Sequence, residues 1–428
     1  MRIRAITFGQ KIPFLNKNET ILPLLQERLE NFLNFKNEIS DELEKINILV
    51  DSKRICSQPL FSYDNKVFYQ KNLKDTLVDI NKQLKFLQEI FSDYELDYFA
   101  CCMMLADQIQ ELGIFEKLLL NEVHSFIKNT KNFFTSLPAA STESGINITA
   151  LKSAAKIIKK LSTPDPFNNL RFCVSSNVKA NIPFFPAAYH ISEKSGFSLA
   201  LEMADVVIKV IEESTSLKDV QYNLLTKFNE IYDILSKVCV KIGRSYDIEF
   251  KGIDLSPAPY PIIEKSIGTA VEKLGFEYFG ANGTLTGVAL IKNAIPTNKE
   301  KVIGFSGFMQ PVLEDYIISK RLSENKFNLD SLLLYSTMCG TGLDVVPLPG
   351  NITEKELFYI LLDLSTLSVI LNKPLTARLM PIPGKDAGDD VEFNFEYFAP
   401  SKVISFRRLT GEIKNDLFNQ NERNLKFF

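Results

Sequence analysis

From Leu170 onward, short apolar runs alternate with longer segments whose apolar residues recur at helical spacing. Such alternation is typical of α/β proteins, in which helices cover the faces of a largely parallel sheet. The expected strands are 170–175, 301–305, 331–337 and 376–381, and the expected helices lie near 196–213, 217–243, 262–274 and 354–371. The tail from Val391 to Phe406 alternates as antiparallel strands do. The pattern therefore predicts an α/β sheet or barrel.

The first part of the chain, residues 1–161, predicts a short strand followed mainly by helices. Met1 to Phe8 alternates like a strand, 19–45 has apolar residues at helical spacing, and 46–50 suggests a second strand. Residues 86–126 are expected to form helices that bury much of their surface. Because neither an internal repeat nor a low-complexity linker follows, we expect 1–428 to form a single compact α/β unit with a loop-rich part at 170–390.

Composition and charge exclude several classes of protein. The 428 residues are 45% hydrophobic and 24% charged, with a net charge of -3, which is typical of a globular chain. The sequence contains no basic patch with interleaved aromatic residues of the kind that binds nucleic acid. The longest apolar run, 357–371, is interrupted by Asp363 and is too short to span a membrane. Six cysteines without a C-x-x-C pair, and only two histidines, argue against a zinc finger. We expect a cytoplasmic protein with reduced thiols and no membrane partner.

Five segments are richer in glycine, proline and polar residues than a simple connection requires. They are 177–190, 252–261, 280–287, 339–350 and 381–390. Proline restricts the backbone and glycine lets it approach a ligand closely, although each segment alone could be a tight turn. Because ligand sites of α/β proteins lie at the carboxyl ends of strands, these segments predict one polar small-molecule site.

Four of these stretches carry a resemblance to a known family: PFFPAAYH (183–190), GIDLSPAP (252–259), CGTGLDVVPLPG (339–350) and KPLTARLMPIPGKDAGD (373–389). The chain resembles, over nearly its whole length, the uncharacterised domain-of-unknown-function family 711, which is classed with proteins of pyruvate formate-lyase-like fold. The resemblance implies a ten-stranded α/β barrel of two parallel half-sheets, with additional helices. It implies no established reaction.

Glycyl-radical chemistry is not expected, although it accompanies this type of fold. It requires a cysteine thiyl and a C-terminal glycine followed by an aromatic residue, whereas Gly411 is followed by Glu412. Cys101 and Cys102 lie in an apolar run, 99–106, which we expect to be helical and packed.

The candidate catalytic residues are Asp254, Glu202, Cys339, Asp344 and His190. Asp254 and Asp344 precede proline-rich segments, where a carboxylate could act as acid and base, bind a divalent cation or cap a turn. Glu202 is expected on an apolar helical face that it shares with Asp205, where a carboxylate needs a partner unless that face is solvated. Cys339 could be an exposed nucleophile or a small buried residue.

The candidate ligand-binding residues are Asn177, Gly283, Thr284, Arg378 and Lys385. Gly283 and Thr284 open an expected helix whose amides could hold a carboxylate or phosphate. Arg378 and Lys385 flank a Pro-Gly turn and would pair with such a group, or are ordinary surface cations. His190 could shuttle protons or lie satisfied in the core.

Two acidic positions are explained by helix ends alone. Glu314 and Asp315 are expected to interact with a helix dipole, and Thr353 with Glu356 matches a capping box.

The leading hypothesis is an enzyme that acts on a small anionic metabolite by acid-base or divalent-cation-assisted chemistry. A non-catalytic metabolite-binding or sensor protein is the alternative, and a scaffold protein whose loops bind nothing is a third. The sequence leaves the substrate, the cofactor and the formation of a homo-oligomer open.

Overall fold

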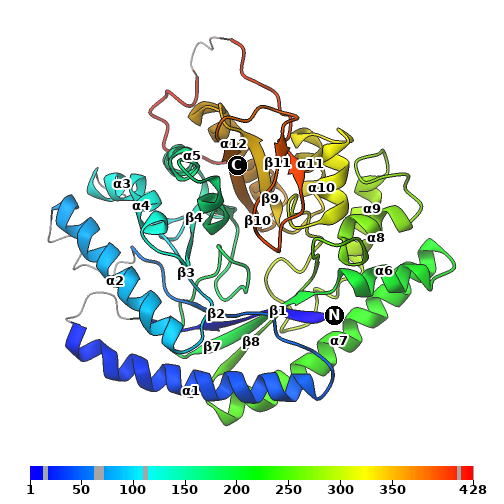
Figure 1. Ribbon diagram of the computed structural model, residues 1–428, viewed down its shortest axis with the longest axis horizontal. Coiled ribbons are helices and arrows are strands. Elements are labelled where there is room, and N and C mark those ends of the chain that lie inside the picture. The colour runs from blue at the N-terminus through cyan, green and yellow to red at the C-terminus, as the bar shows by residue number, and fades with distance from the viewer. Residues whose placement is uncertain (13–17, 62–71, 109–113, 412–415, 428) are drawn as a thin grey trace.

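The computed structural model describes residues 1–12, 18–61, 72–108, 114–411 and 416–427 (Figure 1). Glu412, on which the exclusion of glycyl-radical chemistry partly rested, lies outside these ranges. Within them, no helix is long and apolar enough to cross a membrane.

One large sheet organises the chain. Its central strands follow the order β8-β7-β1-β2-β3-β4-β6-β10-β9. Their bounds are Arg2–Gly9 (β1), Lys53–Cys56 (β2), Tyr98–Cys102 (β3), Phe133–Ser141 (β4), Phe172–Ser176 (β6), Gly196–Glu202 (β7), Glu249–Ala258 (β8), Gly342–Pro349 (β9) and Leu375–Ile382 (β10). Strands from 1–161 and from 170–390 thus belong to the same sheet. Two short strands, Gly145–Asn147 (β5) and Asn424–Leu425 (β13), extend it beyond β4.

The sheet consists of two parallel groups that run in opposite directions. β1, β2, β3, β4 and β6 are mutually parallel, as are β7 with β8 and β9 with β10. The groups meet in antiparallel pairs, β1 with β7 and β6 with β10. Consequently the carboxyl ends of the strands are divided between the two ends of the sheet.

The sheet curves around a common centre, with the helices on its outside (Figure 1). The described strands do not form a closed barrel, because β8 and β9 are free edges of the ladder. Residues 302–311 make only isolated bridges to these edges, Val302 with Ile253 and Pro311 with Asp344. The structure therefore establishes an α/β protein with a large, mixed and mostly parallel sheet.

Twelve α-helices lie among the described residues and cover the sheet. They are Asn18–Glu44 (α1), Leu73–Asp93 (α2), Ile114–Asn121 (α3), Val123–Lys128 (α4), Ile148–Leu161 (α5), Ala204–Glu212 (α6), Leu217–Ser245 (α7), Ile267–Lys273 (α8), Thr284–Asn293 (α9), Tyr316–Ser323 (α10), Leu329–Ser336 (α11) and Glu354–Ile370 (α12). On α1, Phe32 stacks on Phe8 of β1 with ring centroids 4.0 Å apart, and Phe35 contacts Phe197 of β7 at 4.6 Å. Such ring contacts between helix and strand form the core outside the sheet.

Several expected elements are confirmed within one or two residues. The first strand is β1, the helix at 19–45 is α1, and 217–243 and 354–371 are α7 and α12. The capping box of Thr353 and Glu356 begins α12 as expected. Residues 170–175 and 376–381 are β6 and β10, whereas the tail forms only the short pair Asp390–Val391 (β11) and Ser401–Lys402 (β12).

Other expected elements are wrong. Residues 331–336 belong to helix α11, whose C-cap is Thr337 and which a capping box of Asn328 and Ser331 begins. Residues 196–202 form a strand, so Glu202 shares no helical face with Asp205. The run 99–106 starts in β3 and is not helical, 46–50 is a turn that ends in a single bridge, and 301–305 forms one bridge only.

Two segments interpreted as loops, 252–261 and 339–350, consist mainly of strands β8 and β9. Their prolines made these strands look like loops. Proline cannot donate a hydrogen bond to a β-ladder and is normally confined to edge strands. β8 and β9 are the two edge strands of this sheet, where that restriction is weakest.

Candidate functional site

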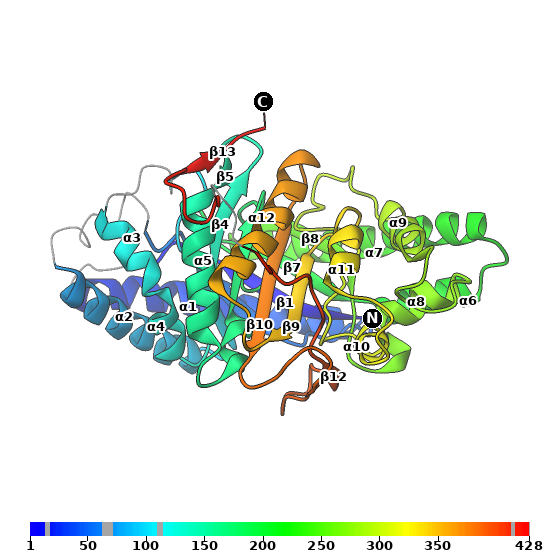
Figure 2. The ribbon, with the colours of Figure 1, turned by 90° about the horizontal axis from the view of Figure 1, so that it is seen from above.

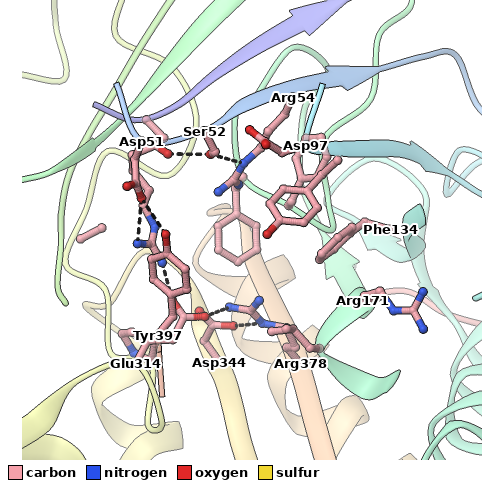
Figure 3. A pocket seen from close by; sticks show the side chains of 18 of the residues that line it. Asp51, Ser52, Arg54, Asp97, Phe134, Arg171, Glu314, Asp344, Arg378 and Tyr397 are labelled. Carbon is pink, nitrogen blue, oxygen red and sulfur yellow. Dashed lines mark hydrogen bonds and ion pairs between the residues drawn. The ribbon is translucent and has the colours of Figure 1, made fainter. Parts of the chain in front are cut away.

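A cavity of about 510 Å³ lies at one end of the curved sheet (Figure 3). Its wall includes Asp51, Asp97, Lys131 and Arg171, which directly precede β2, β3, β4 and β6 or stand one residue further away. The same wall takes residues from the last part of β7 and β8. The two ends of the molecule can be told apart in Figure 2, which shows β12 at one end and β5 with β13 at the other. The volume is within the range of about 300–1,000 Å³ typical of small-molecule sites.

A continuous chain of ion pairs runs along one side of this cavity. Its four cations are Arg2, Arg4, Lys265 and Arg378, and its four carboxylates are Asp51, Glu202, Glu314 and Asp344. Arg4 lies at its middle, 3.4 Å from Asp51 and from Glu202 and 3.7 Å from Glu314. Because this chain of ion pairs contains four positive and four negative groups, its charges balance one another without a ligand.

Two β-bulges direct side chains into this network. Between β1 and β7, Ile3 pairs with Leu201 and Ala5 with Ala200, so Arg4 is the extra residue. Between β10 and β9 the register shifts after Ala377, so that Asp344 and Val345 stand opposite Arg378 alone. An extra residue re-aims the side chains beside it, and bulges are common next to active sites.

The second bulge also contains backbone strain. Val345 has a φ of 43°, in the left-handed region that a β-branched residue rarely adopts. Such strain costs of the order of 1–3 kcal/mol and persists only where the surroundings hold it. Here it is adjacent to Asp344, which supports a functional role for that carboxylate.

Arg378 joins two carboxylates deep in the cavity. Its Nε donates to Asp344 at 2.7 Å and its Nη2 to Glu314 at 2.9 Å. Burial raises the pKa of Asp344, and the Arg378 guanidinium opposes that shift while Glu314 adds to it. Burial also opposes the charge on Arg378, but the two carboxylates outweigh it and raise the pKa of the guanidinium. A carboxyl with a raised pKa beside a cavity is suited to proton transfer.

Arg54 lines the same cavity but stands outside the ion-pair chain. Its Nε donates to Ser52 Oγ at 2.9 Å, and its guanidinium lies 5.5 Å from the Tyr98 ring and 5.2 Å from the Phe185 ring. Burial, together with the neighbouring charge of Arg4, lowers the pKa of Arg54 to about 10. Across the described chain, no carboxylate forms an ion pair with it, and its two terminal nitrogens donate to no protein acceptor.

Arg171 reaches the cavity wall with its side chain turned away. Its Nη1 donates to the carbonyls of Thr130 at 2.6 Å and Lys131 at 3.2 Å, and its Nη2 donates to Asn168 Oδ1 at 2.7 Å. In Figure 3 the guanidinium is directed away from the other labelled side chains. Arg171 therefore braces the start of β4, and Arg54 is the arginine whose terminal nitrogens are available to a ligand.

The segment between β11 and β12, residues 392–400, covers part of the cavity and supplies Phe395, Glu396 and Tyr397 to its wall. Tyr397 donates its hydroxyl to Asp51 Oδ2 at 3.2 Å, and the Arg4 guanidinium lies 4.1 Å from its ring centroid. Burial, with the charge of Asp51, raises the pKa of Tyr397 to about 12, so the phenol remains protonated at neutral pH.

Comparison with known proteins now identifies the family. A family model described as "Uncharacterised ACR (DUF711)" matches residues 1–397, which include every residue that lines the cavity. The chain belongs to this family. The expected resemblance to family 711 is thereby confirmed over nearly the whole chain.

Relatives from the same group carry the name UPF0210 protein. A UPF0210 protein of Pyrobaculum arsenaticum is 29% identical over 63% of this chain and 62% of its own length, and one of Halothermothrix orenii is 30% identical over 65% of this chain and 64% of its own. One of Methanosarcina barkeri is 27% identical over 91% of this chain and 87% of its own length. The chain thus spans less than two thirds of the first two relatives.

Of the ten candidate residues, three line the cavity: Asp254, Asp344 and Arg378. Asp254 is occupied by structural contacts: Oδ1 accepts from Ser256 Oγ at 2.6 Å and from the Ser306 amide at 3.0 Å, and Oδ2 accepts from the Phe305 amide at 2.9 Å. Burial raises its pKa, although these hydrogen bonds favour the charged form. Asp254 therefore braces the 303–307 turn at the cavity wall.

The remaining catalytic candidates lie elsewhere. Glu202 is buried in the ion-pair chain behind Arg4 and does not line the cavity. The Cys339 thiol is buried and donates to the Phe308 carbonyl at 3.1 Å, as a packed residue does. His190 is fully buried beside Asn181, and burial lowers its pKa to about 4, which keeps it neutral at physiological pH.

The other ligand-binding candidates also lie outside the cavity. Asn177 joins Thr142 to Ser368, and Gly283 is the N-cap of α9, with a φ of 102°. The hydroxyl of Thr284 accepts from the Gly280 amide, and Lys385 is exposed. Residues 177–190 still reach the cavity through Pro183, Phe184 and Phe185, whereas 280–287, which join α8 to α9, and 383–390 supply no residue to its wall.

Sequence reasoning missed most of the cavity. The missed polar residues are Arg4, Asp51, Ser52, Arg54, Asp97, Tyr98, Thr130, Lys131, Asp165, Asn168, Arg171, Ser256, Glu314, Glu396 and Tyr397. A usable signal was present in β1 and β2, where Arg4 lies between the buried Ile3 and Ala5 and Arg54 directly precedes the buried Ile55. Glu314 was assigned to a helix dipole, but α10 is capped by Asp315 and Glu314 pairs with Arg378 instead.

No group of three or more histidine, cysteine or acidic residues gathers as metal ligands in the part of the chain that the structure describes.

Proposed function

We propose that the cavity is the active site of an enzyme that acts on a small anionic metabolite by acid-base chemistry. Arg54 carries this proposal, because it is a guanidinium inside a cavity whose terminal nitrogens have no acceptor among the described residues. The Arg54 side chain is half-buried, and an anionic ligand would accept charge-assisted hydrogen bonds from its two terminal nitrogens. Arg54 thus takes the anion-binding role that the sequence suggested for Arg378 and Lys385.

The acid-base groups of the proposal lie across the cavity from Arg54, as Figure 3 shows. Asp344 has a raised pKa, and Arg378 holds it in position at 2.7 Å. In this scheme Asp344 moves a proton to or from the bound anion, and Glu314 stabilises the charge on Arg378. Arg378 therefore positions the carboxylates and does not bind the substrate.

Acid-base chemistry is favoured over a thiyl radical. None of the six cysteines lines the cavity, and all are buried. Burial raises the pKa of the thiols at positions 56, 101 and 173.

We also propose that the sheet is a variant of the ten-stranded barrel of pyruvate formate-lyase type. Two observations support this proposal: the sheet has two parallel groups joined by two antiparallel pairs, and residues 302–311 bridge both of its edges. In that arrangement 302–311 would supply the tenth strand.

The test starts from ligand that co-purifies with the protein, identified by native mass spectrometry. The parent protein, Arg54→Gln and Asp344→Asn would then be compared for binding of that ligand and for its turnover. We expect Arg54→Gln to lose binding about 10- to 100-fold, as removal of a charge-assisted hydrogen bond does. Asp344→Asn should retain binding and lose turnover.

Lys385→Gln is the matched control, because it removes an exposed cation outside the cavity. Unchanged binding by Arg54→Gln would show that the anion binds elsewhere. If the parent binds the ligand and never converts it, with and without added divalent cations, the protein is a sensor or binding protein and not an enzyme.

A further inference from the structure

Arg54 is surrounded by rings. Its guanidinium faces Tyr98 and Phe185, and the Phe134 ring lies 5.1 Å from Tyr98 and 5.7 Å from Phe185. These four side chains form one contiguous surface that lines the cavity. The register explains the contact, because Arg54 pairs with Tyr98 in adjacent strands and Ala100, two residues on, pairs with Phe134.

More rings close the cavity from other elements. Phe184 lies beside Phe185 and faces the Arg378 guanidinium, 5.6 Å away, while Phe395 and Tyr397 come from the segment that covers the cavity. Aromatic rings attract other rings in offset or edge-to-face geometry, beyond the effect of the buried area alone. A ligand whose acid group reaches Arg54 would therefore have rings beside its body.

The charges of the site favour a single negative charge on the ligand. The four cations of the ion-pair chain are balanced by its four carboxylates, and Arg54 is the guanidinium left over. Asp97, Asp165 and Glu396 add negative charge to the wall, and Lys131 adds one positive charge. A phosphate dianion would thus meet two cations outside the ion-pair chain, Arg54 and Lys131, and a larger number of carboxylates, whereas a carboxylate fits the two terminal nitrogens of one arginine.

Resting on the proposed function, we infer that the ligand is an aromatic carboxylate: a monoanion whose acid group binds Arg54 and whose flat body packs against Tyr98, Phe134 and Phe185. The three rings then determine the specificity for an aromatic ligand, and Arg54 determines the affinity for its acid group. Phe134 serves as a specificity residue, since it contacts both rings that flank Arg54.

The experiment is titration calorimetry of the full chain with three probes: 3-phenylpropionate, butanoate and inorganic phosphate. We expect 3-phenylpropionate to bind at least about tenfold more tightly than butanoate, which equals one to two ring contacts, and phosphate to bind weakest. Phe134→Leu keeps an apolar side chain and should reduce the preference for the aromatic acid while leaving butanoate unchanged. Arg54→Gln should weaken both acids, and Lys385→Gln should weaken neither.

The outcomes separate this inference from the function on which it rests. Equal binding of the two acids, or tighter binding of phosphate that Arg54→Gln abolishes, would overturn the aromatic carboxylate and leave Arg54 as the anion site. Binding of every probe unaffected by Arg54→Gln would overturn the anion site as well. Should Arg54→Gln fail to fold, the comparison of the acids in the parent and in Phe134→Leu still decides the inference.

Discussion

Replacing Arg378 with methionine would leave the buried Asp344 without a cation and the half-buried Glu314 with Arg4 alone. The side chain of Arg378 is 5% exposed and that of Asp344 is 3% exposed, and Nε and Nη2 lie 2.7 and 2.9 Å from Asp344 and Glu314. Breaking a buried ion pair from one side typically destabilises a protein by about 3–5 kcal/mol. We expect Arg378→Met to lower the free energy of unfolding by that amount at neutral pH.

The loss should depend on pH in a defined direction. Burial already raises the pKa of Asp344 and Arg378 opposes that shift, so its removal raises the native pKa further. A carboxyl that binds its proton more tightly in the native state than in the unfolded chain loses stability as the pH rises through its native pKa. The variant should therefore be less destabilised at about pH 5 than near neutral pH.

Urea unfolding at the two pH values measures both effects. Arg407→Met is the control, because Arg407 is 85% exposed in its pair with Asp330, and we expect little change. The double variant Asp344→Asn with Arg378→Met should recover part of the loss, since it removes the unpaired carboxylate. A loss below about 1 kcal/mol that does not vary with pH would refute the view that Arg378 compensates buried charge.

Three further predictions concern the cavity wall and its supports. Burial raises the pKa of Asp315 to about 6, so the stability of the parent relative to Asp315→Asn should fall as the pH rises from about 4 to about 6 in urea titrations; a constant difference would contradict that pKa. Gly304→Ala places a Cβ 2.2 Å from Asp254 Oδ2 at a φ of 71°, and a drop of about 1–3 kcal/mol in unfolding free energy is expected; an unchanged melting temperature would disprove the bracing role of Asp254. Tyr397→Phe removes one hydrogen bond to Asp51 and keeps the ring over Arg4, so the free energy of unfolding should fall by about 0.5–1.5 kcal/mol. Loss of the folded state in this variant would contradict that magnitude.

Local patterns predicted the elements whose signals are complete within one segment. The helical period and capping box of α12, the period of α7 and the alternation of β1 each depend on neighbouring residues only. The same reasoning failed for α11, whose apolar residues resemble a strand, and for β8 and β9, whose prolines resemble loops. In those segments partners distant in sequence decide the conformation.

The candidate site shows the same division. Asp344 and Arg378 were found because they stand in unusual segments, but their roles as an ion pair depend on a bulge between β9 and β10. Asp254 was found for the same reason, and its contacts with the 303–307 turn make it structural.

By itself the sequence predicted the α/β class and the family, and it singled out Asp254, Asp344 and Arg378, which the structure places in the wall of the cavity. Only the tertiary structure decided where the cavity lies, because two parallel groups of strands run in opposite directions and divide the strand ends between the two ends of the sheet. It also decided which of three arginines at the cavity has no carboxylate partner. No local pattern shows which of Arg4, Arg54 and Arg378 is paired, and only the placement of carboxylates distant in the chain leaves Arg54 without an ion pair among the described residues.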